Sequence, residues 1–123
     1  FVRVKLFRLG LPGTVTARIY ATLNGKPTGA PLCIGTTNGN TLPTDPPYEW
    51  RGILLNPAYN LIAGVKYALT LKSAGIVADH RVNWRIDCSA PTYPRGEALY
   101  SHNAGASWTK VPTCDYMFEE YGI

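Results

Sequence analysis

The sequence is poor in charge, methionine and histidine. Charged side chains make up 16% of the 123 residues, against roughly 25% in an average soluble domain. Only one Met and two His occur. An apolar share of 46% excludes a disordered chain, which needs high charge and low hydrophobicity. No uncharged stretch combines a strong apolar share with the roughly 20 residues that a membrane-spanning helix needs, so we expect no membrane insertion.

Basic residues form no run along the chain. The net charge of +4 comes from single Lys and Arg residues that alternate with apolar ones. A nucleic-acid footprint instead concentrates these residues on one face or stripe. We therefore expect no nucleic-acid partner.

Signals of catalysis are also missing. The sequence has no Gly-x-Ser-x-Gly element and no phosphate-cradling glycine loop, and neither His lies in a known catalytic setting. Glu119 and Glu120 are adjacent on an expected strand, so they point to opposite faces and cannot form a glycosidase pair. Nothing in the spacing of Asp87 and Glu97 specifies that they meet. The sequence predicts a protein that is not an enzyme.

Three cysteines, Cys33, Cys88 and Cys114, lie far apart and form no Cys-x-x-Cys spacing, which argues against a structural zinc site. They fit one disulfide plus one free thiol in an oxidising compartment, or three buried thiols. Their spacing does not choose between these alternatives. No cofactor is expected. A structural calcium ion is a lesser alternative, with Asp45 the one carboxylate in a suitable loop.

Turn residues and alternating strands dominate the rest of the chain, which has 12 Gly and 10 Pro. Asn24-Gly25 is a strong hairpin signal, and residues 38–47 predict a loop without regular structure. Apolar and polar residues alternate in several segments, as in half-buried strands. The expected strands cover 2–6, 14–21, 29–36, 49–55, 65–72, 81–87, 98–101, 107–110 and 115–121. This pattern predicts an all-β fold, an antiparallel β-sandwich of about eight strands with jelly-roll or Greek-key connections.

Residues 101–108 resemble the Asp-box, a Ser-x-Asp-x-Gly-x-Thr-Trp hairpin found in sialidase-like propellers and other secreted β-proteins. Asn103 stands at the Asp position and Ser107 at the Thr position. Asn can still accept backbone N–H bonds in a tight turn, and Gly105 can adopt a positive φ. We expect a structural role for this hairpin, carried by Ser101, Asn103, Gly105, Ser107 and Trp108.

A wider resemblance follows from the order of several short motifs. They are Leu9-Gly10-x-Pro12-Gly13, Ile19-Tyr20-Ala21-Thr22, Asn24-Gly25-Lys26-Pro27-Thr28-Gly29, Leu61-x-x-Gly64-x-x-Tyr67-Ala68-Leu69, Asn83-Trp84-Arg85, Tyr93-x-x-Gly96, the Asp-box and Phe118-x-x-Tyr121-Gly122. In this order they resemble choice-of-anchor β-sandwich modules of secreted bacterial and archaeal surface proteins and of phage structural proteins. The resemblance implies an extracellular, cell-surface or virion-surface location, and no catalytic residue. We expect one domain over residues 1–123, excised or processed from a longer chain.

Aromatic residues are the best lead to a ligand. Tyr and Trp combine an apolar face with a polar tip, which suits stacking on sugar rings. Parity with aliphatic neighbours places Tyr67, Trp84, Tyr116 and Phe118 in the core, and Trp50 and Trp108 are expected to be packed. The candidate ligand-binding residues are Tyr48, Tyr59, Tyr93, Tyr100 and Arg85.

These residues predict a recognition or attachment module whose most plausible ligand is carbohydrate. The alternative is a structural subunit or decoration domain of a virion, fibre or surface filament. Such a subunit would contact coat proteins, cell-surface proteins or copies of itself, as a homo-oligomer. A module that accompanies a hydrolase in its parent chain would also bind without catalysing.

Overall fold

The computed structural model describes residues 1–44, 48–74, 80–88, 98–101, 105–111 and 114–120. These residues form eleven strands and one short 3-10 helix, which confirms the all-β prediction. The strands are β1 (Val2–Leu9), β2 (Thr14–Leu23), β3 (Lys26–Asn38), β4 (Glu49–Ile53), β5 (Tyr67–Ser73), β6 (Arg81–Trp84), β7 (Ile86–Asp87), β8 (Ala98–Tyr100), β9 (Thr109–Val111), β10 (Asp115–Tyr116) and β11 (Phe118–Glu120); η1 spans Gly39–Thr41.

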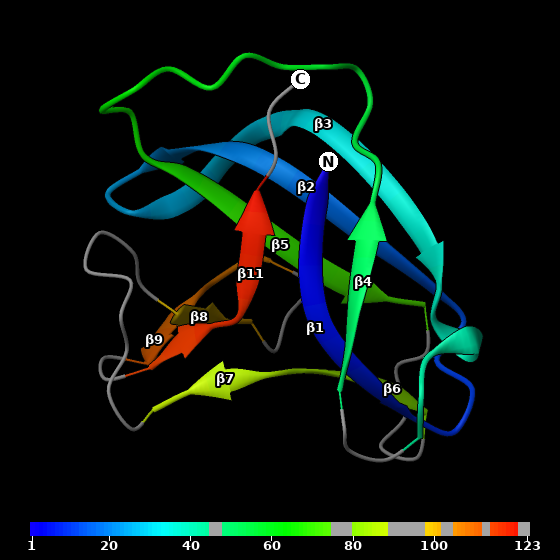
Figure 1. Ribbon diagram of the computed structural model, residues 1–123. Coiled ribbons are helices and arrows are strands. Elements are labelled where there is room, and N and C mark those ends of the chain that lie inside the picture. The colour runs from blue at the N-terminus through cyan, green and yellow to red at the C-terminus, as the bar shows by residue number, and fades with distance from the viewer. Residues whose placement is uncertain (45–47, 75–79, 89–97, 102–104, 112–113, 121–123) are drawn as a thin grey trace.

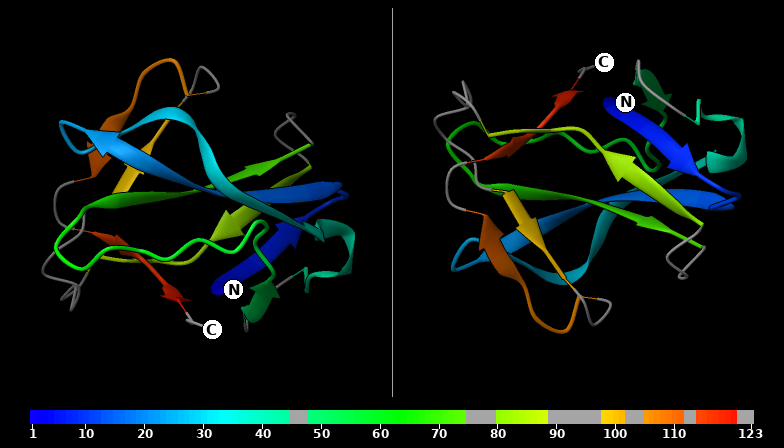
Figure 2. Two further views of the ribbon diagram at one scale, coloured as in Figure 1. Left: turned by 90° about the horizontal axis from the view of Figure 1, so that it is seen from above. Right: turned by 90° about the horizontal axis from the view of Figure 1, so that it is seen from below.

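Two antiparallel sheets pack against each other, as Figures 1 and 2 show. The front sheet has the order β11-β1-β4, with β6 also paired to β1, and the back sheet has the order β3-β2-β5. Alternate residues of each strand point between the sheets, because side chains alternate across a strand. The core that results is formed by Val2, Val4, Leu6, Ala17, Leu42 and Ile53.

Strand β1 has neighbours along both edges. Strand β4 pairs with one edge, and β11 and β6 share the other, with β11 opposite Val2–Val4 and β6 opposite Leu6–Leu9. Between them, the N–H of Arg85 donates to the C=O of Lys5 (2.9 Å), and the N–H of Met117 donates to the C=O of Arg85 (2.9 Å). The expected strand 81–87 is therefore interrupted at Arg85, where the chain leaves β1.

After this junction, the chain makes an excursion that begins at β7 and returns at β10. Asp87 pairs with Asp115. A disulfide joins Cys88, which follows Asp87, to Cys114, which precedes Asp115. The third cysteine, Cys33, is a buried free thiol, and burial raises its pKa. Of the two alternatives for the cysteines, the structure thus has one disulfide and one free thiol. The β8–β9 hairpin lies within the excursion and stands outside both sheets (Figure 2).

Two local features differ from the sequence predictions. Residues 38–47, expected to lack regular structure, contain η1, because the Asn38 side chain accepts the N–H of Asn40 (3.0 Å). Strand β5 begins at Tyr67, so Val65 is exposed instead of inward-facing. The Asn24-Gly25 turn is as predicted, with both residues at positive φ. Within the described residues, no helix has the length and apolarity to cross a membrane.

Candidate binding surface

The outer face of the front sheet carries aromatic rings beside positive charges. Val2, Val4 and Leu6 point inward, so the residues between them on β1 point outward. On β4, Ile53 is buried, and the same alternation turns Trp50 outward, directly opposite Lys5. We call this surface the aromatic–cationic face, and it consists of Arg3, Lys5, Phe7, Tyr48, Trp50 and Arg85. It faces the viewer in Figure 1.

Trp50, on β4, lies beside two cations of the neighbouring strand β1. The guanidinium carbon of Arg3 is 5.6 Å from the centroid of the indole ring, and the Lys5 ammonium nitrogen is 5.5 Å from it. Both distances are within the range of cation–π attraction. Arg3 also forms an ion pair with Glu119 (3.3 Å), opposite it on β11. The indole is half-buried, on the side of β4 opposite to buried Ile53.

Tyr48 is held by a second set of contacts on the same face. Its ring meets the Phe7 ring edge-on, with the centroids 4.6 Å apart. The guanidinium carbon of Arg85 lies 5.0 Å from the Tyr48 centroid. Because Arg85 is also fixed through its backbone between β1 and Met117, this cation is positioned by the junction of the sheet.

A small residue keeps one end of the face flat. Gly52 is the next outward-facing residue of β4 after Trp50; it is exposed and pairs with Arg3. A Cβ atom at Gly52 would lie 3.7 Å from the ring of Phe1. The Phe1 ring therefore lies over Gly52 and adds a fourth aromatic ring to those of the face; Phe1 is 49% exposed.

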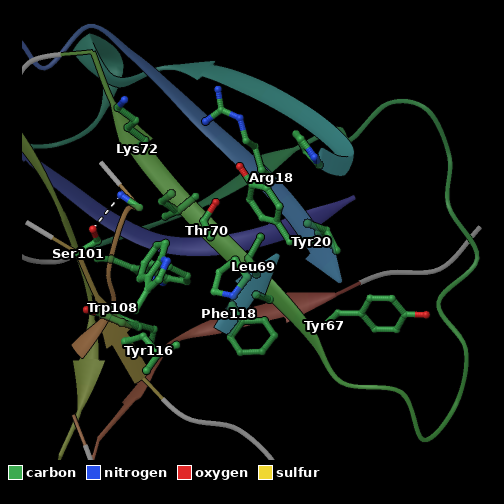
Figure 3. Close-up of a pocket in the computed structure, with 18 of the residues that line it drawn as sticks. Arg18, Tyr20, Tyr67, Leu69, Thr70, Lys72, Ser101, Trp108, Tyr116 and Phe118 are labelled. Carbon is green, nitrogen blue, oxygen red and sulfur yellow. Dashed lines mark hydrogen bonds between the residues drawn. The ribbon is translucent and has the colours of Figure 1, made fainter. Parts of the chain in front are cut away.

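A groove along the free edge of β5 is a second candidate region. Figure 3 shows Trp108, Tyr116 and Phe118 on one side of β5, and Arg18, Thr70 and Lys72 toward its other side. Within the described residues, β5 pairs with β2 alone. The groove thus has polar and apolar walls, and one of them is the β8–β9 hairpin.

The hairpin has several features expected of an Asp-box. Gly105 has a positive φ of 92°, and its N–H donates to the Ser101 hydroxyl (2.8 Å). A Cβ atom at Gly105 would lie 3.7 Å from the Trp108 ring, so this ring folds back over the turn. Ser107 lies on the exposed turn side. Asn103 falls outside the described residues.

The predicted ligand-binding residues do not form one cluster. Tyr48 and Arg85 come together on the aromatic–cationic face, whereas Tyr100 lines the β5 groove. Tyr59 lies on the exposed segment 54–66, with its ring centroid 6.2 Å from that of Tyr67. Tyr93 lies outside the described residues.

Sequence reasoning missed Trp50 and Phe7. Trp50 was expected to be packed rather than exposed; it is half-buried, but on the outer face, because its strand parity opposes that of buried Ile53. Phe7 continues the outward row of Arg3 and Lys5, so parity was the signal in both cases.

The predicted core aromatics are mostly confirmed. Trp84 and Phe118 pack against the core cluster. Tyr116 stacks on Trp84, with the ring centroids 4.5 Å apart, and burial raises the pKa of Tyr116. Tyr67 is an exception, because its ring points away from this group toward segment 54–66 (Figure 3), where its hydroxyl accepts the N–H of Ile62 (3.1 Å).

Titratable groups do not converge in the part of the chain that the structure describes. No group of three or more His, Cys, Asp or Glu side chains there could hold a metal ion. The calcium candidate Asp45 and the carboxylate Glu97 lie outside the described residues. His80 accepts the N–H of Leu11 through Nδ1 (2.8 Å), which gives it a loop-bracing contact.

Comparison with known proteins adds no relative: no family model, no curated protein and no solved structure matches the chain.

Proposed function

We propose that this protein is a non-catalytic extracellular recognition module that binds carbohydrate on its aromatic–cationic face. The observation that carries the proposal is the placement of Trp50 beside Arg3 and Lys5, with their charged groups 5.6 and 5.5 Å from the ring centroid. Tyr48, beside Arg85, provides a second ring on the same face.

The chemistry of this face suits a sugar. Aromatic rings offer apolar surfaces to the C–H faces of pyranose rings, and guanidinium and ammonium groups donate hydrogen bonds to hydroxyl oxygens. Ordering long side chains on binding costs about 0.5–1.5 kcal/mol each. The contacts of Trp50 and Tyr48 reduce this cost, because they already restrict the neighbouring cations.

An oxidising location is supported by the Cys88–Cys114 disulfide. Disulfides persist in secreted and surface-exposed proteins and are rare in reducing compartments. The sequence resemblance to choice-of-anchor modules agrees with this location. We accordingly assign the module to the extracellular space, a cell surface or a virion surface.

A glycan array, followed by affinity measurements on the best binders, tests the proposal. Trp50→Ala should weaken binding at least tenfold, because it removes the ring that two cations contact. Trp108→Ala is the matched control, since it removes the same side chain from the β8–β9 hairpin, and it should change affinity less than twofold. Thermal unfolding of each variant verifies that it is folded. Equal losses in both variants, or no glycan binding by the native domain, would refute the proposal.

A structural-subunit role is the second candidate, and segment 54–66 favours it. Large apolar side chains are exposed along this segment, including Leu54 (67%), Ile62 (60%) and Val65 (49%). Exposed apolar patches often mark protein–protein contacts, and a stable interface buries upwards of about 1,000 Å². Sedimentation velocity at increasing concentration distinguishes the two roles. Assembly that Ile62→Asp abolishes, without any glycan binding, would favour the structural role.

A further inference from the structure

We infer that the aromatic–cationic face selects acidic saccharides, those that carry a carboxylate or sulfate group, over neutral ones. This inference rests on the proposed function and specifies its ligand class. It follows from the charges on the face and from how few of them are neutralised by the protein.

Positive charge exceeds negative charge on this face. Arg3 pairs with Glu119. Within the described residues, Lys5 and Arg85 form no ion pair with a carboxylate; their side chains contact the rings of Trp50 and Tyr48 instead. Cation–π contacts leave the full charge of both groups in place.

These two cations are neighbours in the sheet. The N–H of Arg85 donates to the C=O of Lys5 (2.9 Å), so the two residues lie side by side on adjacent segments of the chain. Both side chains extend from the same face, where they lie over the rings of Trp50 and Tyr48. Like charges on neighbouring strands repel each other. An anionic group bound between them relieves that repulsion, which is a gain that a neutral ligand cannot provide.

The arrangement of rings and charges indicates the kind of anion. A bare inorganic anion would leave Trp50 and Tyr48 unused, whereas an acidic saccharide brings a pyranose ring and a charged group together. Single-stranded nucleic acid also combines rings with charge, but its binding sites use a positively charged groove that follows the backbone. Here the charge is confined to a few residues at the centre of one sheet. We therefore assign the face to acidic saccharides.

The test compares three hexasaccharides by isothermal titration calorimetry: oligogalacturonate, a heparin fragment and neutral galactohexaose. At least one acidic probe should bind the native domain tenfold or more tightly than the neutral one, and its affinity should fall with rising salt. The two acidic probes separate carboxylate from sulfate as the preferred group. Lys5→Gln combined with Arg85→Gln should remove the preference, because affinity for the acidic probe should fall at least tenfold further than affinity for the neutral one.

The back sheet supplies a control with the same change in net charge. Arg18 on β2 and Lys72 on β5 also lie on adjacent strands, and Arg18→Gln combined with Lys72→Gln should keep the preference. Neutral and acidic probes that bind equally would overturn the inference and leave the proposed function standing. No binding of any saccharide would overturn both. Tighter binding of a single-stranded oligonucleotide than of either acidic probe would overturn the inference in favour of nucleic acid.

Discussion

The outer faces of the two sheets contain similar residue types, but the residues are arranged differently. On the front sheet, Trp50 is bordered by Arg3 and Lys5. On the back sheet, Arg18 lies opposite Thr70 and Lys72 lies opposite Thr16. Among the described residues, no cation on the back face lies over an aromatic ring. On the front sheet, contacts with aromatic rings preorganise the cations for binding. On the back sheet, the cations lie beside threonines and are solvated.

The difference arises from the positions of the strands in their sheets. β1 is central, and β4 on one edge and β6 and β11 on the other fix the register of its outward residues. β5 is an edge strand within the described residues, and the nearby hairpin belongs to the disulfide-closed excursion. We therefore expect the aromatic–cationic face to be insensitive to changes that alter the β5 groove.

Removal of the disulfide should have the largest effect on stability, and it should leave the aromatic–cationic face intact. Cys88→Ala combined with Cys114→Ala opens a link between residues 26 positions apart. The chain-entropy estimate for a loop of this size is about 3–4 kcal/mol of lost stability. Urea unfolding measures this loss. Saccharide affinity at the aromatic–cationic face should stay within twofold of native at low denaturant, and a tenfold loss would show that the face depends on the excursion.

Substitution of Arg51 should cause the next largest loss of stability. Arg51 has the inward parity of β4, where its guanidinium pairs with Glu49 (2.6 Å) and donates to the hydroxyls of Thr37 and Thr41 (both 2.9 Å). Hydrogen bonds to charged groups contribute about 1.5–3 kcal/mol each at most, and the partial exposure of Glu49 reduces the value of the ion pair. Arg51→Met should lower the free energy of unfolding by about 2 kcal/mol.

Lys72→Met is the control for Arg51→Met, because Lys72 is exposed on the back face. Surface substitutions of this kind usually change stability by less than about 0.5 kcal/mol. A similar loss in both variants would contradict the distinction between an arginine that joins the sheets and a lysine that is solvated.

Alkaline pH produces the smallest effect, and it acts on the interior and the groove. Burial raises the pKa of Cys33 above 9.0 and that of Tyr116 above 10.0. The folded state then retains protons that the unfolded state loses. The stabilisation from these two groups is fully present below pH 9. The free energy of unfolding falls as the pH rises further, by at most about 1.4 kcal/mol per pH unit for each group. Cys33→Ala should reduce the fall between pH 9 and 10 in urea titrations; an unchanged fall would contradict this origin.

Sequence periodicity predicted much of the fold because burial follows strand parity. Val2, Val4 and Leu6 alternate with Arg3 and Lys5, and this pattern alone predicts which side of β1 is buried. The break at Arg85 was not predictable, since residues 81–87 alternate without interruption. It depends on hydrogen bonds to Lys5 and Met117, which are distant in sequence.

The candidate site was only partly predictable for the same reason. Tyr48 and Arg85 were both candidates, but the sequence did not predict that they meet. The structure brings them into contact across 36 intervening residues. Arg3 and Lys5 alternate with buried residues along β1, but Arg85 joins them only because its segment lies beside β1. A count of charge along the chain cannot reveal that gathering, because it depends on strand order.

The three tryptophans offer the most direct test, since Trp50 lies on the aromatic–cationic face and the other two lie away from it. Trp50 lies on the aromatic–cationic face, Trp84 donates its indole N–H to the C=O of Met117 (2.9 Å) in the interior, and Trp108 lines the β5 groove. Their indole N–H resonances can be followed by two-dimensional NMR during titration with the hexasaccharides. The Trp50 resonance should shift while those of Trp84 and Trp108 stay in place. A shift of Trp108 with Trp50 unmoved would contradict this prediction.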